Sequence, residues 1–457
     1  MNLNSWNFPN NIPEPFSKDL KQIIGAAIQA VDPASAVIRQ VGFQDGKLQI
    51  NGKPVLDCKP DARFRVAAFG KAALEMVYGL DQVLGEQIIG GIIVTKHAAV
   101  SCDLPGNRFS IYYGNHPVPG ENSVAAARAV VTFLNTRSMD DVFTFLISGG
   151  GSSLLCLPEE PLTLKDLQAV TSALLASGAT IQEMNIIRKH LDRVKGGKLA
   201  AAVTGMPLVS LVISDVVDNS LSSIASGPTV PDTSTFLDVE AIVSRYALWE
   251  KIPVAVRRFI LDGMSGKSPE TIQDGHPTFA KAAAAIIASN HDAMSAAKAK
   301  AESFGFKVMM DEKPFNGEAS SLGEKLVRKA RKMQQTALDS GTPACVIFGG
   351  ESTVTIRGTG KGGRNLEVAL GAIYALAETK DETLVTLATD GEDGPTDAAG
   401  ACVTSSTLRD SEARNLDVLR ALRNNNSYEF AQNAGLLIKT GPTGTNVNDL
   451  VFWFYTP

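Results

Sequence analysis

The sequence lacks several features that would assign it to a common class. Its five cysteines stand singly, with no C-x-x-C pair and no metal-ligand spacing, so we expect reduced thiols. A net charge of −5 gives no general positive field for nucleic acid or an anionic membrane. No apolar run reaches the ~18 residues that span a bilayer, and the first residues lack the regions of a signal peptide. We therefore expect a cytoplasmic protein without nucleic-acid or membrane partners.

The usual nucleotide and hydrolase motifs are also missing. Gly266-Lys-Ser268 resembles the end of a P-loop, but Leu261 stands where the first glycine is needed. Protein-kinase signatures and the G-x-S-x-G elbow of hydrolases are absent. The stretch Gly358–Gly363 matches G-x-G-x-x-G, yet no acidic residue follows at the spacing of a ribose ligand. An anion site at the start of the next helix is favoured there over a dinucleotide site, with a surface loop as the alternative.

What the sequence does contain is a regular alternation of apolar strands and helices. Continuous apolar strands between helices are typical of parallel sheets buried on both faces. The 457 residues exceed one ordinary domain. We predict two α/β domains with mostly parallel sheets: a Rossmann-like N-terminal domain over 1–235, a linker over 236–281, and a smaller C-terminal domain over 282–457.

One stretch combines a buried strand with three consecutive glycines. Phe143–Ile147 is mostly apolar and runs into Ser148-Gly-Gly-Gly-Ser-Ser153. Glycines bring bare amide N–H groups close to a ligand, and a helix beginning there would add its positive end. The stretch therefore predicts a cradle for a phosphate or carboxylate, made by Gly149, Gly150, Gly151, Ser152 and Ser153. A tight turn without a ligand is the alternative.

Further polar residues follow the predicted strands, at the edge where ligands bind in such sheets. Each has a structural alternative: a surface lysine, a turn histidine, a solvated acidic loop or a solvated basic helix face. The residues are Lys71, Lys96, His116, Asp215 and Asp390 at strand ends or in turns, and Arg188 and Lys195 on a basic segment. Glycine turns, separated cations and strand-end aspartates suit phosphoryl transfer with Mg²⁺.

These motifs, taken in order, resemble the glycerate 2-kinase family (class II glycerate kinases), including its C-terminal MOFRL domain. The resemblance covers nearly the whole chain. Its motifs are Phe69-Gly-Lys-Ala-Ala73, Asn115-His-Pro-Val-Pro-Gly120, Ile147-Ser-Gly-Gly-Gly-Ser-Ser153, Arg188-Lys-His-Leu191, Lys195-Gly-Gly197, Ser214-Asp215, Ala225-Ser-Gly-Pro-Thr229, Gly349-Gly-Glu351, Gly362-Gly-Arg-Asn365 and Thr389-Asp-Gly391.

The resemblance implies ATP-dependent phosphorylation of D-glycerate to 2-phosphoglycerate, with a divalent cation such as Mg²⁺ and the active site between the two domains. It implies catalytic roles for Lys71, Arg364 and Asp215, and a metal role for Asp390 and Asp215. Binding roles extend to Glu351, Gly362, Gly363 and Asn365. A homodimer is the assembly to test.

Two other functions remain open from the sequence. Members of the family have also been labelled hydroxypyruvate reductases, so NAD(P)H-dependent reduction of hydroxypyruvate is the alternative activity. A non-catalytic module that binds a sugar acid or a nucleotide is the third.

Overall fold

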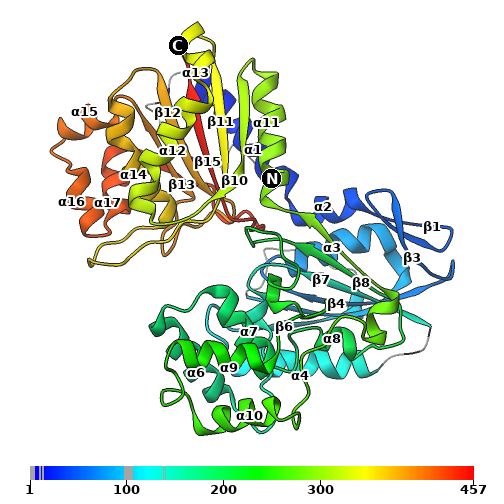
Figure 1. Ribbon diagram of the computed structural model, residues 1–457. Coiled ribbons are helices and arrows are strands. Elements are labelled where there is room, and N and C mark those ends of the chain that lie inside the picture. Colours follow the sequence, from blue (N-terminus) through cyan, green and yellow to red (C-terminus); the bar gives the residue numbers. More distant parts are fainter. Residues whose placement is uncertain (1–5, 10–11, 13–14, 97–105, 137, 139) are drawn as a thin grey trace. The chain divides into compact units, whose positions relative to one another are not determined.

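The computed structural model describes residues 6–9, 12, 15–96, 106–136, 138 and 140–457 (Figure 1). The chain forms two compact units, and each is described by itself. The insert unit is Pro33–Ile287, and the terminal unit is Met1–Asp32 together with Ala288–Pro457. Over the described residues, no helix is both long enough and apolar enough to cross a membrane.

The insert unit is built on a six-stranded sheet in the order β6-β5-β4-β7-β8-β9. Numbered along the chain, this is the order 3-2-1-4-5-6 of doubly wound dinucleotide-binding folds. The pairs β6–β5, β5–β4, β4–β7 and β7–β8 are parallel, so the predicted Rossmann-like sheet is confirmed. The strands are β4 (Arg63–Phe69), β5 (Ile88–Thr95), β6 (Phe109–Tyr113), β7 (Asp141–Ile147), β8 (Leu208–Ile213) and β9 (Ala282–Ala288).

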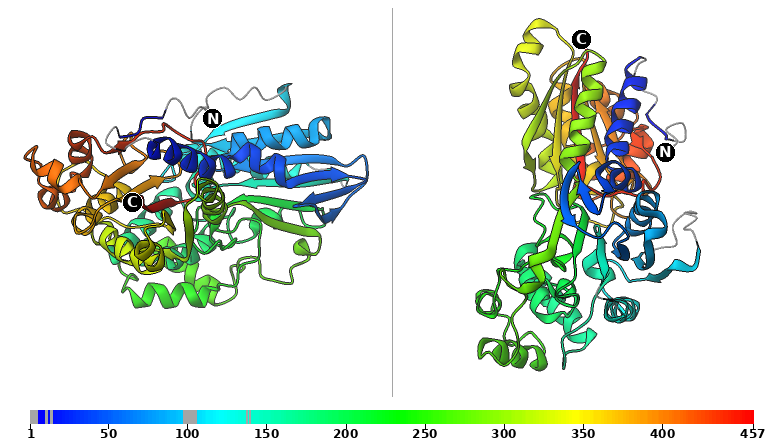
Figure 2. Two further views of the ribbon diagram at one scale, coloured as in Figure 1. Left: turned by 90° about the horizontal axis from the view of Figure 1, so that it is seen from above. Right: turned by 90° about the vertical axis from the view of Figure 1, so that its right-hand side faces the viewer.

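Helices cover both faces of this sheet. The helix α3 (Ala73–Leu84) lies on one face and α4 (Glu121–Asn135) on the other (Figures 1 and 2). Apolar residues of α4 pack with Phe69, Phe143 and Phe145 in one core, because both faces of β7 are buried along its whole length. The unit also contains α2 (Pro33–Gln40), α5 (Gly151–Leu154), α8 (Lys198–Ala201), and a three-stranded sheet of β1 (Val41–Gln44), β2 (Lys47–Ile50) and β3 (Lys53–Asp57).

The segment predicted as a linker is a packed part of the insert unit. Its helices α9 (Phe236–Arg245) and α10 (Val254–Met264) share a core with α6 (Leu164–Ser177) and α7 (Ile181–Leu191). Phe236 is fully buried in that core. The helical spacing of apolar residues in 236–264 therefore forms a layer of helices rather than a connection.

The terminal unit has a mixed sheet in the order β10-β11-β15-β12-β13-β14. Only β10–β11 is a parallel pair; the neighbouring pairs from β11 to β14 are antiparallel. The expectation of a mostly parallel sheet is therefore wrong for this unit, because the last strand returns between β11 and β12. The strands are β10 (Lys307–Phe315), β11 (Ala344–Gly350), β12 (Glu382–Ala388), β13 (Gly400–Thr404), β14 (Leu437–Ile438) and β15 (Asp449–Tyr455).

The two faces of this sheet bury different helices. Trp453 belongs to the core formed with α12 and α14, whereas its neighbour Phe454 packs edge-on against Phe16 of α1. Figures 1 and 2 show α1 and α11 on that second face. The helices are α1 (Phe16–Ala30), α11 (Asn290–Ser303), α12 (Ala319–Met333), α13 (Gln335–Ser340), α14 (Arg364–Ala377), α15 (Thr407–Glu412), α16 (Val418–Arg423) and α17 (Ser427–Ala434).

The observed division differs from the predicted boundaries at both ends of the insert unit. The first 32 residues belong to the terminal unit, because the apolar face of α1 packs against α11 and the last strand. Strand β9, predicted to start the second domain at Ala282, is instead an edge strand of the insert-unit sheet. An amphipathic helix or an edge strand does not specify its partner, so neither difference was readable from the pattern.

Candidate functional site

The candidate site of the insert unit lies where the strand order reverses. Strands β4 and β7 are parallel neighbours and end in register, with Phe69 opposite Ile147. Ligands of doubly wound sheets bind beyond the carboxyl ends of the strands at this switch point. The turns that follow are Gly70-Lys71 and Ser148-Gly-Gly-Gly151, so two of the predicted motifs meet there.

Backbone bonds hold these two turns together. The amide of Lys71 donates to the carbonyl of Gly149 at 2.9 Å, and the amide of Ala72 donates to the buried Ser148 Oγ at 3.0 Å. Gly70 has φ +131°, and a Cβ at this position would lie 2.1 Å from Ser148 Oγ. The close approach therefore requires glycine at position 70 and fixes where the Lys71 side chain begins.

The glycine stretch leaves backbone donors available. No described residue accepts a hydrogen bond from the amides of Gly149, Gly150 or Ser152. Gly150 adopts the left-handed conformation with φ +81°. The helix that follows, α5, has only four residues, so its dipole contributes less than the sequence led us to expect. The cradle consists of amides without an acceptor among the described residues rather than of a long helix terminus.

Three predicted side chains gather around this cradle. A Cβ built on Gly150 would lie 3.3 Å from both His116 Nε2 and Lys71 Cγ. A Cβ on Gly149 would lie 2.3 Å from Asp215 Oδ2. Burial raises the pKa of Asp215, and the charge of Lys71 opposes that shift. The structure therefore brings Lys71, His116, Asp215 and the glycines together within one unit.

The remaining predictions for the insert unit divide between nearby and structural residues. Ser152 Oγ is 2.9 Å from Ser226 Oγ, and Ser153 Oγ donates to the Gly150 carbonyl at 3.1 Å. Both hydroxyls therefore brace the loop. Arg188 is half-buried on α7, and burial lowers its pKa. Lys96 is half-buried where β5 ends.

Lys195 is a structural residue. Its ammonium group is buried, donates to Asp192 Oδ2 at 2.6 Å and to the Leu155 carbonyl at 2.8 Å. A buried ammonium group that is paired with a buried carboxylate and a carbonyl is held by the protein itself. The predicted binding role for Lys195 is therefore not supported by its position.

In the terminal unit, Arg364 is held by two carboxylates. Its Nε and Nη2 donate to Asp449 at 2.6 and 3.0 Å, and its Nη1 donates to Glu351 at 2.7 Å. Burial alone would lower the pKa of the guanidinium, but the charges of Asp449 and Glu351 raise it above its ordinary value. Arg364 is thus a fixed charge whose orientation is set by a bidentate pair.

The sheet register explains this cluster. Asp449 begins β15 and lies opposite both Gly350, the last residue of β11, and Ala388, the last residue of β12. Glu351 and Asp390 follow those two strands, so an antiparallel strand start meets two strand ends at one edge. The sequence analysis did not predict a role for Asp449 because it assumed parallel strands. The available signal was a single acidic residue directly before the last apolar run.

In the second glycine-rich stretch, Gly358–Gly363, the first four amides are bonded within the protein, and only those of Gly362 and Gly363 have no acceptor among the described residues. Side chains of three consecutive asparagines, 424–426, and one of their carbonyls accept from its backbone. Arg357 and Gly358 donate to Asn425 Oδ1 at 2.6 and 3.0 Å. The amides of residues 359, 360 and 361 also donate to this asparagine segment, at 2.9 to 3.2 Å.

The start of α14 is likewise occupied. Asp393 accepts from the amides of Asn365 and Leu366 at 3.0 and 2.8 Å, and a Cβ on Gly363 would meet its carboxylate. Burial raises the pKa of Asp393 to about 6, against the effect of those two bonds. Asp393 thus takes two of the amides at the helix start where an anion site was predicted, and that site stays a prediction. Gly363 and Asn365 serve this cap, and Gly362 packs against Ser427.

The predicted metal ligands lie in different units. Asp215 follows β8, and Asp390 follows β12, where it accepts from the amide of Glu392 at 3.1 Å. In the described part of the chain, no group of three or more His, Cys, Asp or Glu side chains is arranged to hold a metal ion. A Mg²⁺ ion needs only one or two protein carboxylates when phosphates and water complete its shell. Either aspartate could therefore supply a single ligand to a Mg²⁺ ion bound to phosphates.

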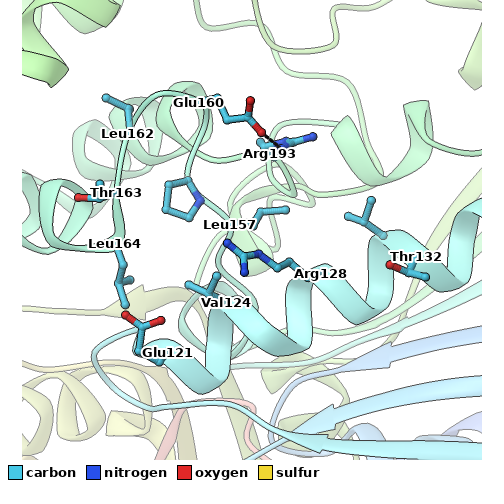
Figure 3. Close-up of a pocket in the computed structure, with 12 residues that line it drawn as sticks. Glu121, Val124, Arg128, Thr132, Leu157, Glu160, Leu162, Thr163, Leu164 and Arg193 are labelled. Atoms are coloured by element: carbon cyan, nitrogen blue, oxygen red, sulfur yellow. Dashed lines mark hydrogen bonds and ion pairs between the residues drawn. The ribbon is translucent and has the colours of Figure 1, made fainter.

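A separate hollow of about 540 Å³ in the insert unit contains none of the predicted residues. Figure 3 shows α4 along one side of it and the segment 157–164 along the other. Arg193 pairs with Glu160 at 2.9 Å, and Arg128 lies near Leu157. No glycine lines it, and we assign it no part in the chemistry.

Comparison with known proteins agrees with this layout. The family described as domain of unknown function DUF4147 matches residues 19–261, and the MOFRL family matches residues 344–449. A "Glycerate 2-kinase" of Pyrococcus horikoshii is 39% identical over 436 residues, which are 95% of this chain and 96% of that protein. The chain belongs to the glycerate 2-kinase family. The resemblance seen in the motifs is thereby confirmed.

Other relatives of the glycerate 2-kinase family extend this result. A "D-glycerate 2-kinase" of Thermotoga maritima is 37% identical and covers 96% of this chain and 98% of its own length. A "Putative hydroxypyruvate reductase" of Agrobacterium vitis is 36% identical, covering 94% and 92%. The crystal structure of a glycerate kinase from Thermotoga maritima aligns with a TM-score of 0.82 at 36% identity, over 97% of this chain and 100% of that one.

Proposed function

We propose that this protein is a glycerate 2-kinase that transfers the terminal phosphoryl group of ATP to the 2-hydroxyl of D-glycerate. Family relatives with that name match over nearly their whole length. The observation that carries the proposal is the cradle at the switch point, where glycine amides that lack an acceptor among the described residues lie beside Lys71. Backbone donors without a partner and a lysine suit an anion that gains charge during transfer.

The residues of the cradle receive roles from their chemistry. Lys71 offsets charge on the transferring phosphoryl group or on the glycerate carboxylate, and the amides of Gly149 and Gly150 donate to the same anion. Asp215 accepts the proton of the attacking hydroxyl, since burial raises its pKa and makes it a stronger base than an exposed aspartate. His116, whose Nε2 lies near Gly150 as Lys71 does, contacts the substrate in this proposal.

Arg364 keeps a proposed role as a phosphoryl contact. Three of its five N–H groups are used by Asp449 and Glu351, so two remain for a ligand. A Mg²⁺ ion would be held by Asp215 or Asp390 and would neutralise charge on the ATP phosphates. ATP as the phosphoryl donor and Mg²⁺ as its cation are both part of this proposal.

Reduction of hydroxypyruvate fits the fold less well. The first strand–helix turn of a dinucleotide-binding sheet carries G-x-G-x-x-G, but here Gly70 is followed by Ala72 and Glu75 at the second and third glycine positions. The next strand ends in Thr95-Lys96 rather than in the acid that binds the ribose of NAD. The sheet therefore has the strand order of dinucleotide-binding folds but lacks their glycine motif and their ribose-binding acid.

A coupled assay tests the proposal. The protein is incubated with D-glycerate, ATP and Mg²⁺, and the product is passed to enolase, which dehydrates 2-phosphoglycerate directly. We expect ADP release together with an equal amount of phosphoenolpyruvate, with no need for a phosphoglycerate mutase. ADP without phosphoenolpyruvate would mean phosphorylation at another carbon or simple ATP hydrolysis. Oxidation of NADPH or NADH by hydroxypyruvate without ATP would favour the reductase instead.

A further inference from the structure

A cavity of about 520 Å³ lies in the terminal unit beside the start of α14. We call it the α14 cavity. Its walls are residues 351–354 and 356, glycines and Arg364 from 360–364, Gly394 and Pro395, with Glu367 and Asn425. This volume is within the usual range for sites that bind small organic molecules. The asparagine bonds described above hold its glycine wall in place.

The α14 cavity contains a buried hydroxyl that lacks a partner. Ser352 is 4% exposed, and no described residue makes a hydrogen bond with its Oγ. Glu367 is also buried, accepts from Asn425 Nδ2 at 2.9 Å, and burial raises its pKa. Buried polar groups are normally satisfied. A buried hydroxyl without a partner, in the same lining as the Glu367 carboxyl, indicates a ligand that brings polar atoms but no negative charge.

The charges around the cavity argue against a polyphosphate inside it. Asp449 and Glu351 already surround the single arginine of the lining, and Asp393 accepts from the amides of Asn365 and Leu366, two of the donors at the helix start that could attract an anion. Any phosphate inside would also face Glu367. The interior is therefore suited to a neutral group, while the two remaining N–H donors of Arg364 can meet a charged group leaving the cavity.

Apolar side chains complete the lining. Val354 packs against the core beneath the cavity, and Pro395 lines another part of the wall. Ile356 also lines the cavity, yet it is 81% exposed, the most exposed large apolar side chain among the described residues. Such a residue at the border of a cavity can cover one face of a flat ring. Glycerate, a small carboxylate, offers neither a ring nor enough volume.

We infer that the α14 cavity binds the nucleoside part of the phosphoryl donor, with the purine against Val354 and Ile356 and its polar atoms on Ser352. This inference rests on the proposed kinase function, because it assigns ATP rather than glycerate to the cavity. The phosphates then begin at Arg364, outside the neutral interior.

The test fills the cavity without touching its charges. Ser352→Leu places an apolar side chain where the nucleoside would lie, and we expect KM for ATP to rise at least about tenfold. The KM for D-glycerate should stay unchanged. Inorganic tripolyphosphate, which has the phosphates but no nucleoside, should inhibit the variant and the parent protein equally. Thr336→Leu, an exposed position on α13 of the same unit, is the matched control and should leave all three constants unchanged.

Three results would overturn the inference: an unchanged KM for ATP, a matching rise in the inhibition constant of tripolyphosphate, or a rise confined to D-glycerate. If Ser352→Leu unfolds, Ser352→Ala is tested in its place by calorimetry. Loss of the hydroxyl should weaken ADP binding and leave tripolyphosphate binding unchanged. The same calorimetric measurement separates the two proposals. If ADP binds the parent protein and Ser352→Ala weakens that binding, the α14 cavity is supported as the nucleoside site, even if no phosphoryl transfer to glycerate occurs.

Discussion

The two glycine-rich stretches of this protein look alike in sequence and differ in structure. In Gly149–Gly151 of the insert unit, two successive amides find no acceptor among the described residues. In Gly358–Gly363 of the terminal unit, the amides of the first four residues are bonded to the segment Asn424–Asn426, and only the last two amides find no acceptor among the described residues. The difference lies in acceptors supplied about 65 residues away. Glycine makes a close approach possible, but a distant side chain decides whether the amides remain available to a ligand.

The largest effect should come from the cradle with free amides. Lys71→Ala removes the lysine side chain that lies beside Gly150 of this cradle, and we expect turnover to fall roughly 100- to 1,000-fold. The fold should persist, because the Lys71 backbone bond to Gly149 does not involve its side chain. Steady-state kinetics and thermal unfolding measure the two quantities. Lys59→Ala, an exposed lysine of the same unit, is the control; near-parental turnover of Lys71→Ala would remove the cradle from the mechanism.

A smaller effect, on the stability of the terminal unit, should follow from removing an asparagine side chain that binds the second glycine-rich stretch. Asn425→Ala leaves the amides of Arg357 and Gly358 and the carboxyl of Glu367 without their partner. We expect a loss of about 3 kcal/mol, from unsatisfied groups and from alanine at a positive φ. This corresponds to a fall in Tm of roughly 6–12 °C for a unit of this size.

The control for that variant is Asn433→Ala, since Asn433 is exposed on the neighbouring helix α17. Its Tm should change by no more than about 1 °C. If Asn425→Ala proved equally silent, the asparagine bonds would not be what distinguishes the two glycine stretches.

The smallest effect should appear as a pH dependence at the helix cap. The pKa of Asp393 is raised to about 6 in the folded protein, above its value in the unfolded chain. The folded state therefore binds more protons between about pH 4 and 6, and its stability falls as the pH rises through that window. For Asp393→Asn, the stability difference from the parent should shrink by about 2 kcal/mol between pH 4 and pH 7.

Denaturant titrations at the two pH values measure this difference. Asp397→Asn is the control, because hydrogen bonds from Lys439 and Tyr428 lower the pKa of Asp397. Its contribution is present above the unfolded pKa and is lost only as the pH falls below that value. A stability difference for Asp393→Asn that stays constant from pH 4 to pH 7 would show that the cap carboxylate remains charged throughout.

The sequence predicted the features that depend on local pattern. The continuous apolar strands indicated the parallel sheet of the insert unit, and the glycines after β7 indicated the cradle with Lys71 and Asp215 beside it. Features that depend on distant pairing were not accessible. The return of β15 between β11 and β12 brings Asp449 to Arg364, and the burial of Lys195 against Asp192 makes a basic residue structural. Assembly as a homodimer stays a prediction.

The chain passes between its two units twice, near residues 32 and 287. The insert unit is therefore one uninterrupted stretch that can become complete on the ribosome before residues 288–457 are synthesised. The terminal unit must wait: α1 is made first, but its partners α11 and β15 come more than 250 residues later. A C-terminal fragment that begins at α11 would therefore lack α1, the helix that covers one face of its sheet. It would expose the aromatic residues that Phe16 contacts in the whole protein.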